Sequence, residues 1–241
     1  MAEAEHLHAL LRKMESISDL SAQDKESLLA LPVTIRHYDG NTDIISEGNR
    51  TRHCCLVLDG LLCRYKTVEN GNRQILSLHV PGDIPDLHSL HIEVMDHSLG
   101  TLSPSRVGFI PHEAVLQLTR SSYRIAEAFW REALIDAAVF REWMVGIGRR
   151  PAQSRLAHLL CEFATKTRVV GLSDGLVFEL PMTQTEIGDA LGLSTVHTNK
   201  TLKALRKSGL IEIRARRMKV LDWNSLCELG EFDPTYLHLR K

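Results

Sequence analysis

The residues best suited to binding chemistry lie close together, between positions 194 and 203. With helical spacing, one exposed face of this stretch carries Thr195, His197, Asn199, Lys200 and Lys203. Amide and hydroxyl groups can hydrogen-bond to base edges in the major groove of DNA, whereas ammonium groups attract phosphates. This mixture of side chains favours recognition of double-stranded DNA.

Two short helices joined by a tight turn must hold this face. Thr183 can cap the first helix, with Glu186 at the third position after it as a capping box requires, and Gly192 ends that helix. Ser194 can cap the second helix. The inner stripe of the second helix is expected to be Val196 or Thr198, then Leu202 and Leu205. The spacing predicts a helix-turn-helix whose second helix enters the major groove.

A basic hairpin is expected after these helices. Residues 210–213 and 218–221 have the pattern of two short strands, and the segment between them contains Arg214, Arg216 and Arg217. Such a hairpin is typical of the wing of a winged helix, whose arginines contact phosphates. A generic helical hairpin followed by a solvated basic loop would give similar patterns, but the glycine turn together with the wing favours DNA binding.

Charge is distributed unevenly along the 241 residues. The whole chain has 29 Lys and Arg against 30 Asp and Glu, yet residues 149–220 have 13 against 6 and residues 1–148 have 14 against 20. This asymmetry predicts a basic module joined to an acidic one. We expect a sensor-like domain at 1–119, a dimerisation helix at 120–148 and a DNA-binding domain at 149–241.

The N-terminus has no signal-peptide pattern, and no apolar run approaches the ~18 residues that a membrane span requires. We therefore expect a cytoplasmic protein that does not bind membranes. The five cysteines, without any Cys-x-x-Cys pair, fit reduced and mostly buried thiols better than a disulfide framework or a zinc site. They are Cys54, Cys55, Cys63, Cys161 and Cys227.

Short β-rich segments separated by Asp-Gly and Asn-Gly turns occupy residues 33–110. These turns recur at intervals of roughly ten residues, which predicts a small antiparallel barrel or sandwich. A short helix over about 21–30 precedes it. The expected strands are 33–38, 43–46, 54–58, 61–66, 74–80 and 106–110.

A long helix is expected from about 123 to 148, followed by a hinge at Arg149-Arg150-Pro151 and a helix over 152–166. The apolar stripe of the long helix could cover the barrel or pack on the same helix of a second subunit. At 1.5 Å per residue the helix is ~39 Å long, which exceeds a small barrel and favours a dimer. The stripe consists of Phe129, Ala133, Ala137, Phe140, Met144 and Ile147.

With its parts in this order, the chain resembles the bacterial Crp/Fnr family of transcription regulators along nearly its whole length. The strongest match is at 183–211, where Glu186-Ile187-Gly188, Gly192, Ser194 and Gly209-Leu210-Ile211 agree with the family. Gly48, Gly60 and Pro81-Gly82-Asp83 agree in the β-rich half, and Ser154-Arg155-Leu156-Ala157 opens the DNA-binding half.

The resemblance implies an α+β fold with three parts: an N-terminal antiparallel β-roll of double-stranded β-helix or jelly-roll type, a long dimerisation helix, and a C-terminal winged helix-turn-helix. It also implies a homodimer on an inverted-repeat site, with recognition helices ~34 Å apart. RNA polymerase is the further partner that such a regulator implies.

The recognition helix differs from that of relatives, because Thr195 and Val196 replace an arginine or glutamate. We hypothesise that Asn199 contacts adenine, Val196 a thymine methyl and Lys200 guanine. The remaining set, expected to hold phosphates or to flank the interface, is Thr183, Ser194, Thr195, His197, Lys203, Arg214, Arg216 and Arg217.

Two departures from the family concern the effector. Members that bind cyclic nucleotides have a Gly-Glu pair where this chain has Pro85-Asp86, followed by an arginine. No lysine or arginine lies between Asp83 and Arg106 here, so a buried phosphate would stay uncompensated. We predict that cyclic AMP and cyclic GMP are not ligands.

Oxygen-sensing members hold an iron–sulfur cluster with closely spaced N-terminal cysteines, whereas here no cysteine precedes Cys54. Histidines in the effector segment could bind haem or a divalent metal. An ordinary half-buried role is favoured, because no His-x-His or Glu-x-x-His pair fixes a geometry. We predict no cofactor and no metal. The effector-pocket candidates are Asp83, Pro85, Asp86, His88, His91 and His97.

Three alternatives remain open at this point. The roll could sense haem, a metal or redox state, or it could be a scaffold that senses nothing. A metal-dependent cupin-like enzyme is a remote alternative, because the sequence has no ligand set of that kind, no Gly-x-Ser-x-Gly and no phosphate-binding Gly-x-x-x-x-Gly-Lys. We therefore expect no enzymatic activity.

Overall fold

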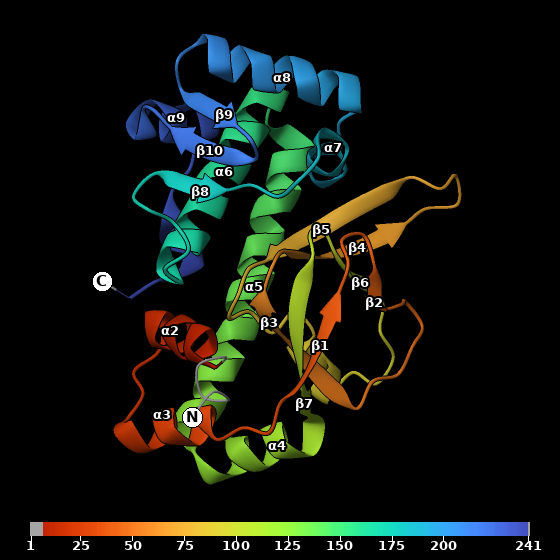
Figure 1. The fold of residues 1–241 in the computed structure, drawn as a ribbon, viewed down its shortest axis with the longest axis vertical. Helices are drawn as coiled ribbons and strands as arrows, with labels where there is room; N and C mark the ends of the chain where they lie inside the picture. The colour runs from red at the N-terminus through yellow and green to blue at the C-terminus, as the bar shows by residue number, and fades with distance from the viewer. Residues whose placement is uncertain (1–6, 241) are drawn as a thin grey trace. The chain divides into compact units, whose positions relative to one another are not determined.

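The computed structural model describes residues 7–240 and divides into two compact units (Figure 1). The first unit contains residues up to 66, residues 77–137 and the C-terminal residues from 238, and the second contains 67–76 and 138–237. Helix α5 (Tyr123–Arg149) contributes residues to both units. No helix within residues 7–240 is long and apolar enough to span a membrane.

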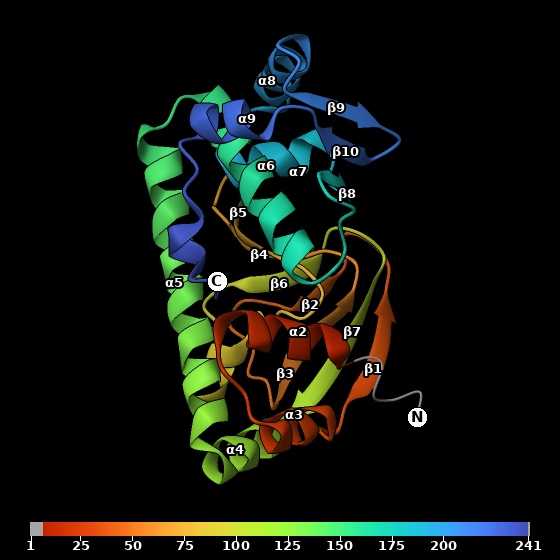
Figure 2. The same ribbon diagram turned by 90° about the vertical axis from the view of Figure 1, so that its left-hand side faces the viewer.

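The first unit is built on two antiparallel sheets that form a β-roll. One sheet has the order β1-β7-β3 and the other the order β2-β6-β4-β5 (Figure 2). In the first sheet, β7 lies between its neighbours with Phe109 opposite both Thr34 and Cys55. The strands are β1 (Thr34–Tyr38), β2 (Asp43–Ile45), β3 (His53–Asp59), β4 (Leu62–Thr67), β5 (Arg73–His79), β6 (Ser98–Thr101) and β7 (Ser105–Pro111).

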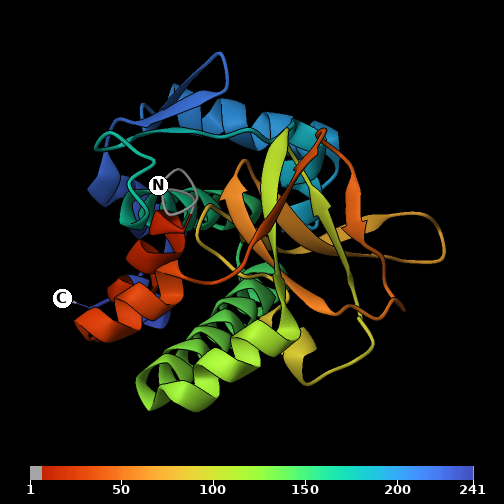
Figure 3. The same ribbon diagram turned by 60° about the horizontal axis from the view of Figure 1, so that its bottom comes forward.

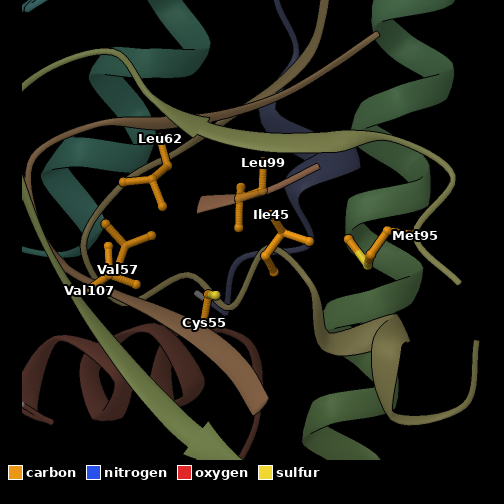
Figure 4. Close-up of a cluster of buried hydrophobic side chains, with 7 residues drawn as sticks. All are labelled: Ile45, Cys55, Val57, Leu62, Met95, Leu99 and Val107. Carbon is orange, nitrogen blue, oxygen red and sulfur yellow. The ribbon is translucent and has the colours of Figure 1, made fainter. Parts of the chain in front are cut away.

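Alternating side chains of both sheets point inward and form the core of the roll (Figure 4). Cys55, Val57, Leu62, Leu99 and Val107 are each fully buried. Removal of this apolar surface from water is the main favourable contribution to the stability of the roll. Ile45 and Met95 complete the cluster.

Among the described residues, three helices and one 3₁₀ turn complete the roll, and α5 follows them. Helices α2 (His8–Ile17) and α3 (Ala22–Leu29) lie beside each other (Figure 3). Ser21 caps α3 through a capping box with Asp24. The 3₁₀ helix η1 (Leu87–Leu90) contacts β3, and α4 (His112–Ser121) follows β7 directly.

The second unit packs three α-helices, one 3₁₀ helix and a three-stranded sheet around the long helix α6 (Ala152–Val169). The N-cap of α6 is Pro151. The sheet has the order β8-β10-β9 and is antiparallel throughout. Twelve residues of α6 are buried, so this helix is the centre of the unit. The other elements are β8 (Val177–Glu179), α7 (Gln184–Leu191), α8 (Thr195–Lys207), β9 (Ile211–Arg214), β10 (Arg217–Val220), α9 (Trp223–Gly230) and η2 (Pro234–Leu237).

The expected fold class is confirmed, and each of the six expected strands of the roll is present. Two strands were missing from the expectation. Strand β6 has a glycine at its third position, and β8 has only three residues, so neither shows a clear alternation of apolar and polar residues. Both are held by pairing with strands that are distant in the sequence, β4 and β10 respectively.

Helix α5 has one buried and one exposed apolar face. Phe129 is only 4% exposed, so it lies on the buried face of α5 and not on the exposed apolar stripe where we expected it. The adjacent Trp130 is 69% exposed and lies on that stripe instead. The repeat of apolar residues explains the error. Phe129 and Trp130 are both large and apolar, and the sequence does not show which of the two begins the exposed stripe, although they point about 100° apart around the helix. The exposed apolar residues of α5 are Tyr123, Trp130, Leu134, Phe140, Met144, Val145 and Ile147; of the other expected positions, Ala133 is exposed and Ala137 half-buried.

Candidate functional site

Side-chain caps begin both helices of the helix-turn-helix. The Thr183 hydroxyl accepts a hydrogen bond from the backbone N–H of Glu186 at 3.2 Å, and the Glu186 carboxylate accepts one from the N–H of Thr183 at 2.6 Å. Ser194 caps α8 by accepting from the N–H of His197 at 3.3 Å. The cap residues that the sequence indicated are therefore those that begin α7 and α8.

The turn between α7 and α8 depends on two glycines. Gly192 has a φ of +64°, in the left-handed region that favours glycine, and it ends α7. Gly188 lies inside α7, where a Cβ would come within 2.5 Å of the Leu193 carbonyl oxygen. Because any side chain would collide there, Gly188 is the residue that lets the turn fold back against α7.

A side chain of helix α6 holds the end of α7 at this turn. The Arg155 guanidinium donates a hydrogen bond to the Leu191 carbonyl at 2.6 Å, which satisfies a carbonyl at the end of α7. On α8, the inner position is Thr198, which is fully buried and donates its hydroxyl hydrogen bond to the Ser194 carbonyl. Val196, the other residue considered for that stripe, is 67% exposed.

The outer face of α8 holds the predicted base-reading residues. Thr195, His197, Lys200 and Lys203 are exposed, as Val196 is, and Asn199 is half-buried. A large apolar residue on such a face is suited to contact with a thymine methyl.

Two residues of α7 extend this face, and sequence reasoning missed both. The Gln184 side-chain oxygen accepts a hydrogen bond from the Asn199 amide at 2.7 Å, and the hydroxyls of Thr185 and Thr195 lie 3.2 Å apart. Their polar side chains directly after the expected cap Thr183 were the available signal, since N-terminal residues of both helices of such a motif lie near the DNA backbone.

The wing is a two-residue hairpin between β9 and β10. Ala215 and Arg216 have φ values of +47° and +65°, which a tight hairpin turn requires. Arg214, Arg216 and Arg217 are exposed, and Arg214 forms an ion pair with Glu212. Within residues 195–220 there are eight lysines and arginines but this one acidic residue. The recognition helix and the wing thus form a positively charged surface suited to phosphates.

In the roll, the effector-pocket candidate Asp83 belongs to a buried ion cluster. Lys13 of α2 lies 2.9 Å from Asp83 Oδ1 and 3.2 Å from Glu132 Oε1 of α5. Burial favours the uncharged amine, but the two carboxylates outweigh it and raise the pKa of Lys13 above its usual value. Burial also raises the pKa of Glu132, against the attraction of Lys13. Asp83 is therefore occupied by protein partners.

Arg64 of β4 supplies the positive charge that the sequence segment 83–106 lacks. Its guanidinium donates to Ser77 Oγ at 2.8 Å and to His79 Nε2 at 3.0 Å, and it forms an ion pair with Asp136 of α5. Burial is the main cause that lowers the pKa of His79 to about 4. The sequence could not show this cluster, because its members come from β4, β5 and α5.

Asp86, fully buried, is bonded to β3. Its Oδ1 accepts the backbone hydrogen bond of Cys55 at 2.7 Å, whereas Oδ2 has no hydrogen-bond partner among the described residues. Burial raises the pKa of Asp86 to about 7. Pro85, just before it, is also buried.

The histidine candidates separate into two groups. His88 and His97 lie together, with ring centroids 5.1 Å apart, and Asp96 joins them. His91 is exposed and is not part of that group. The five cysteines are free thiols, and burial raises the pKa of Cys54 and Cys55 above the usual range. Cys54, Cys55, Cys63 and Cys161 are buried, as expected.

Comparison with known proteins matches both units to described domains. Residues 154–229 match the Crp-like helix-turn-helix domain, and residues 35–122 match the cyclic nucleotide-binding domain. The transcriptional activator protein FnrL of Cereibacter sphaeroides is 29% identical over 199 residues, which cover 80% of this chain and 79% of FnrL. FnrA of Stutzerimonas stutzeri is 23% identical over 211 residues, 88% of this chain and 86% of its own length.

Among solved structures, FixK2 from Bradyrhizobium japonicum superimposes with a TM-score of 0.74 at 23% identity, over 83% of this chain and 98% of its own. This similarity shows the same fold. Together the matches define a transcription regulator with a cyclic-nucleotide-binding-like roll and a DNA-binding helix-turn-helix. The chain belongs to the Crp/Fnr family.

Replacing Gly188 with alanine tests the packing of the turn. Because the new Cβ would collide with the Leu193 carbonyl, we expect Gly188→Ala to lower the free energy of unfolding by about 1–3 kcal/mol and to weaken DNA binding. The measurements are urea denaturation and retention of fragmented genomic DNA. Gly148→Ala is the matched control: the space around Gly148 is open, so the helix should gain up to about 1 kcal/mol. Equal effects of both variants would contradict this explanation.

Asp86→Asn tests the buried carboxyl group. In the unfolded chain this group titrates near 3.8, so between pH 4 and 7 only the folded state holds the proton and stability falls as pH rises. Asparagine keeps the acceptor for the Cys55 N–H and cannot ionise. We expect the variant to be more stable than the wild type at pH 8, by up to about 4 kcal/mol, with the gain shrinking towards pH 4.

Urea denaturation at several pH values measures this difference, with the exposed Asp39→Asn as control. A stability difference between Asp86→Asn and wild type that stays constant from pH 4 to 8 would show that Asp86 is charged throughout.

Proposed function

We propose that this regulator acts as a homodimer that binds an inverted-repeat DNA site through two copies of α8. The observation that carries the proposal is the surface formed by α8 and the wing, which combines exposed base-reading groups with eight basic residues and one acidic residue. We propose a cytoplasmic location, because the DNA that the protein would bind lies there. RNA polymerase is inferred as a partner because FnrL and FnrA are named transcriptional activators.

The exposed stripe of α5 supports the dimer. Trp130, Leu134, Phe140, Met144 and Ile147 recur at intervals of three to six residues and are each 43–69% exposed. A row of large apolar side chains along a helix of 27 residues is costly to leave in water. A second copy of the same helix would cover it by coiled-coil packing. We therefore propose α5 as the dimerisation helix, at residues 120–148, between the roll (1–119) and the DNA-binding domain (149–241).

The proposed base contacts follow from the outer face of α8. Asn199 can pair with adenine through both atoms of its amide once it exchanges Gln184 for the base. Val196 would contact a thymine methyl, and Lys200 would approach guanine. Ser194, His197 and the wing arginines would hold phosphates, which fix the register but carry little sequence information.

We also propose that cyclic AMP and cyclic GMP are not the ligands of this roll. Pro85 and Asp86 replace the ribose-binding pair, and Asp86 is buried against β3. The Arg64 guanidinium is held by Ser77, His79 and Asp136, and the Lys13 ammonium by Asp83 and Glu132. A phosphate would have to displace these partners and face Asp83 and Asp136. Titration with either nucleotide is expected to give no heat of binding at micromolar concentrations.

Two variants test the DNA-binding surface after selection of bound sequences from fragmented genomic DNA. Asn199→Ala should relax preference at one base pair of each half-site, at about 1–3 kcal/mol, because a bidentate base contact is lost. Arg216→Gln should weaken binding to all sequences alike. It should also reduce the slope of the logarithm of the binding constant against the logarithm of salt concentration by about 1. Gln184→Ala is the control for orientation of Asn199 and should leave the preferred base unchanged. The reverse pattern would mean that α8 presents a different face.

A charge on the α5 stripe tests the dimer. Met144→Glu puts a carboxylate at a position that is 60% exposed in one chain and that we propose is buried in the dimer. We expect it to yield monomers in analytical ultracentrifugation and to lose binding to the inverted repeat. Arg131→Glu, an exposed position outside the stripe, should remain dimeric. A Met144→Glu variant that stays dimeric would contradict the assignment.

A further inference from the structure

Two buried imidazole nitrogens in the roll have no hydrogen-bond partner among residues 7–240. They are Nε2 of His88, on η1, and Nε2 of His97, just before β6. The His97 side chain is only 9% exposed. A buried polar atom without a partner is unfavourable, so such atoms are rare in folded proteins and call for an explanation.

The two rings and one carboxylate come together. His88 and His97 have ring centroids 5.1 Å apart, and each of His88, Asp96 and His97 offers a ligand atom within 4.8 Å of the other two. Within the described part of the chain, this is the one group of three histidines, cysteines or acidic residues with that geometry. The three residues lie at most nine positions apart. They form no His-x-His or Glu-x-x-His pair, so no sequence motif identified them.

The hydrogen bonding prepares His97 to act as a ligand. Its Nδ1 lies 2.6 Å from Asp96 Oδ1, and this contact favours the tautomer with the proton on Nδ1. The lone pair is then on Nε2, the atom without a partner. A carboxylate that orients the far nitrogen of a histidine is common at metal sites.

We propose that His88 and His97, with Asp96 orienting the His97 ring, form a binding site for one divalent first-row transition-metal ion of the Zn²⁺ type. The two imidazole nitrogens supply the ligands that such ions favour, whereas Ca²⁺ and Mg²⁺ prefer oxygen alone. Asp96, with its side chain 80% exposed, gives the ion a route from solvent and a negative charge beside it. This assignment goes beyond the sequence analysis, which predicted no metal.

The surrounding charges and distances are compatible with an ion. Arg64 acts on both rings more strongly than Asp136 does, and its positive charge opposes an ion; the Asp136 carboxylate paired with it offsets part of that charge. Ligands of a four-coordinate zinc ion lie about 3.4 Å apart. The candidate ligand atoms lie within 4.8 Å of one another, so binding needs them to move closer together. The exposed segment 91–94 between the two histidines leaves room for that shift.

The test uses the full chain, treated with chelator and then titrated with Co²⁺ alone or Zn²⁺ alone. We expect one ion per chain by calorimetry, and visible absorption bands of nitrogen-coordinated Co²⁺ that added Zn²⁺ removes. His88→Ala and His97→Ala should each weaken binding at least 100-fold, and Asp96→Asn 10–100-fold. His91→Ala removes an exposed histidine of the same segment and should bind as the wild type does.

Circular dichroism of each variant shows whether the roll is folded, and His97→Gln replaces His97→Ala if the smaller side chain prevents folding. The proposal is wrong if the folded wild type binds neither ion, if the double variant of His88 and His97 binds as tightly as the wild type, or if His91→Ala loses as much affinity. The titration contains no DNA, so its outcome is independent of the proposed dimeric DNA-binding function.

Discussion

The close approach of Gly188 and the Leu193 carbonyl sets the direction of the recognition helix. No side chain fits between them, since a Cβ on Gly188 would lie 2.5 Å from that oxygen. The carbonyl oxygen of Gly188 accepts the N–H of Leu193 at 2.9 Å, so the same residue also closes the turn by a hydrogen bond. With α7 held by Arg155 and α8 begun by Ser194, the outer face of α8 is fixed before any DNA is bound. Preorganisation of this kind lowers the entropy lost on binding.

The interior of the roll obeys a different constraint, which is the cost of burying charge. Lys13 satisfies two carboxylates at once, and Arg64 satisfies a third together with two neutral groups. Among residues 7–240, four buried atoms of the roll have no hydrogen-bond partner: Asp86 Oδ2, Glu132 Oε2 and Nε2 of both His88 and His97. Leaving such atoms unpaired in a folded protein is unfavourable. A ligand that paired with the two imidazole nitrogens would remove that part of the cost.

Local signals in the sequence predicted the DNA-binding half well, because caps, the glycine turn and the wing arginines each act within a few residues. Gly192 and Ser194 could be placed from spacing alone. The buried clusters of the roll could not, because Lys13, Arg64 and Glu132 meet only through tertiary packing. Phe129 was misplaced by one position for a related reason: the sequence shows that α5 has an apolar period, but the choice between Phe129 and Trp130 depends on which face the roll covers. The pairing of His88 with His97 depends likewise on the path of the chain between them.

Helix α5 carries two kinds of contact on different faces. Glu132 and Asp136 point into the charged clusters of the roll, whereas Trp130 and Leu134, within the same two turns, are exposed. A change in charge beside Arg64 and Asp136 would therefore act on a helix whose other face we propose to be the dimer contact. An ion bound by His88 and His97 would attract Asp136 and repel Arg64, and so would weaken their ion pair.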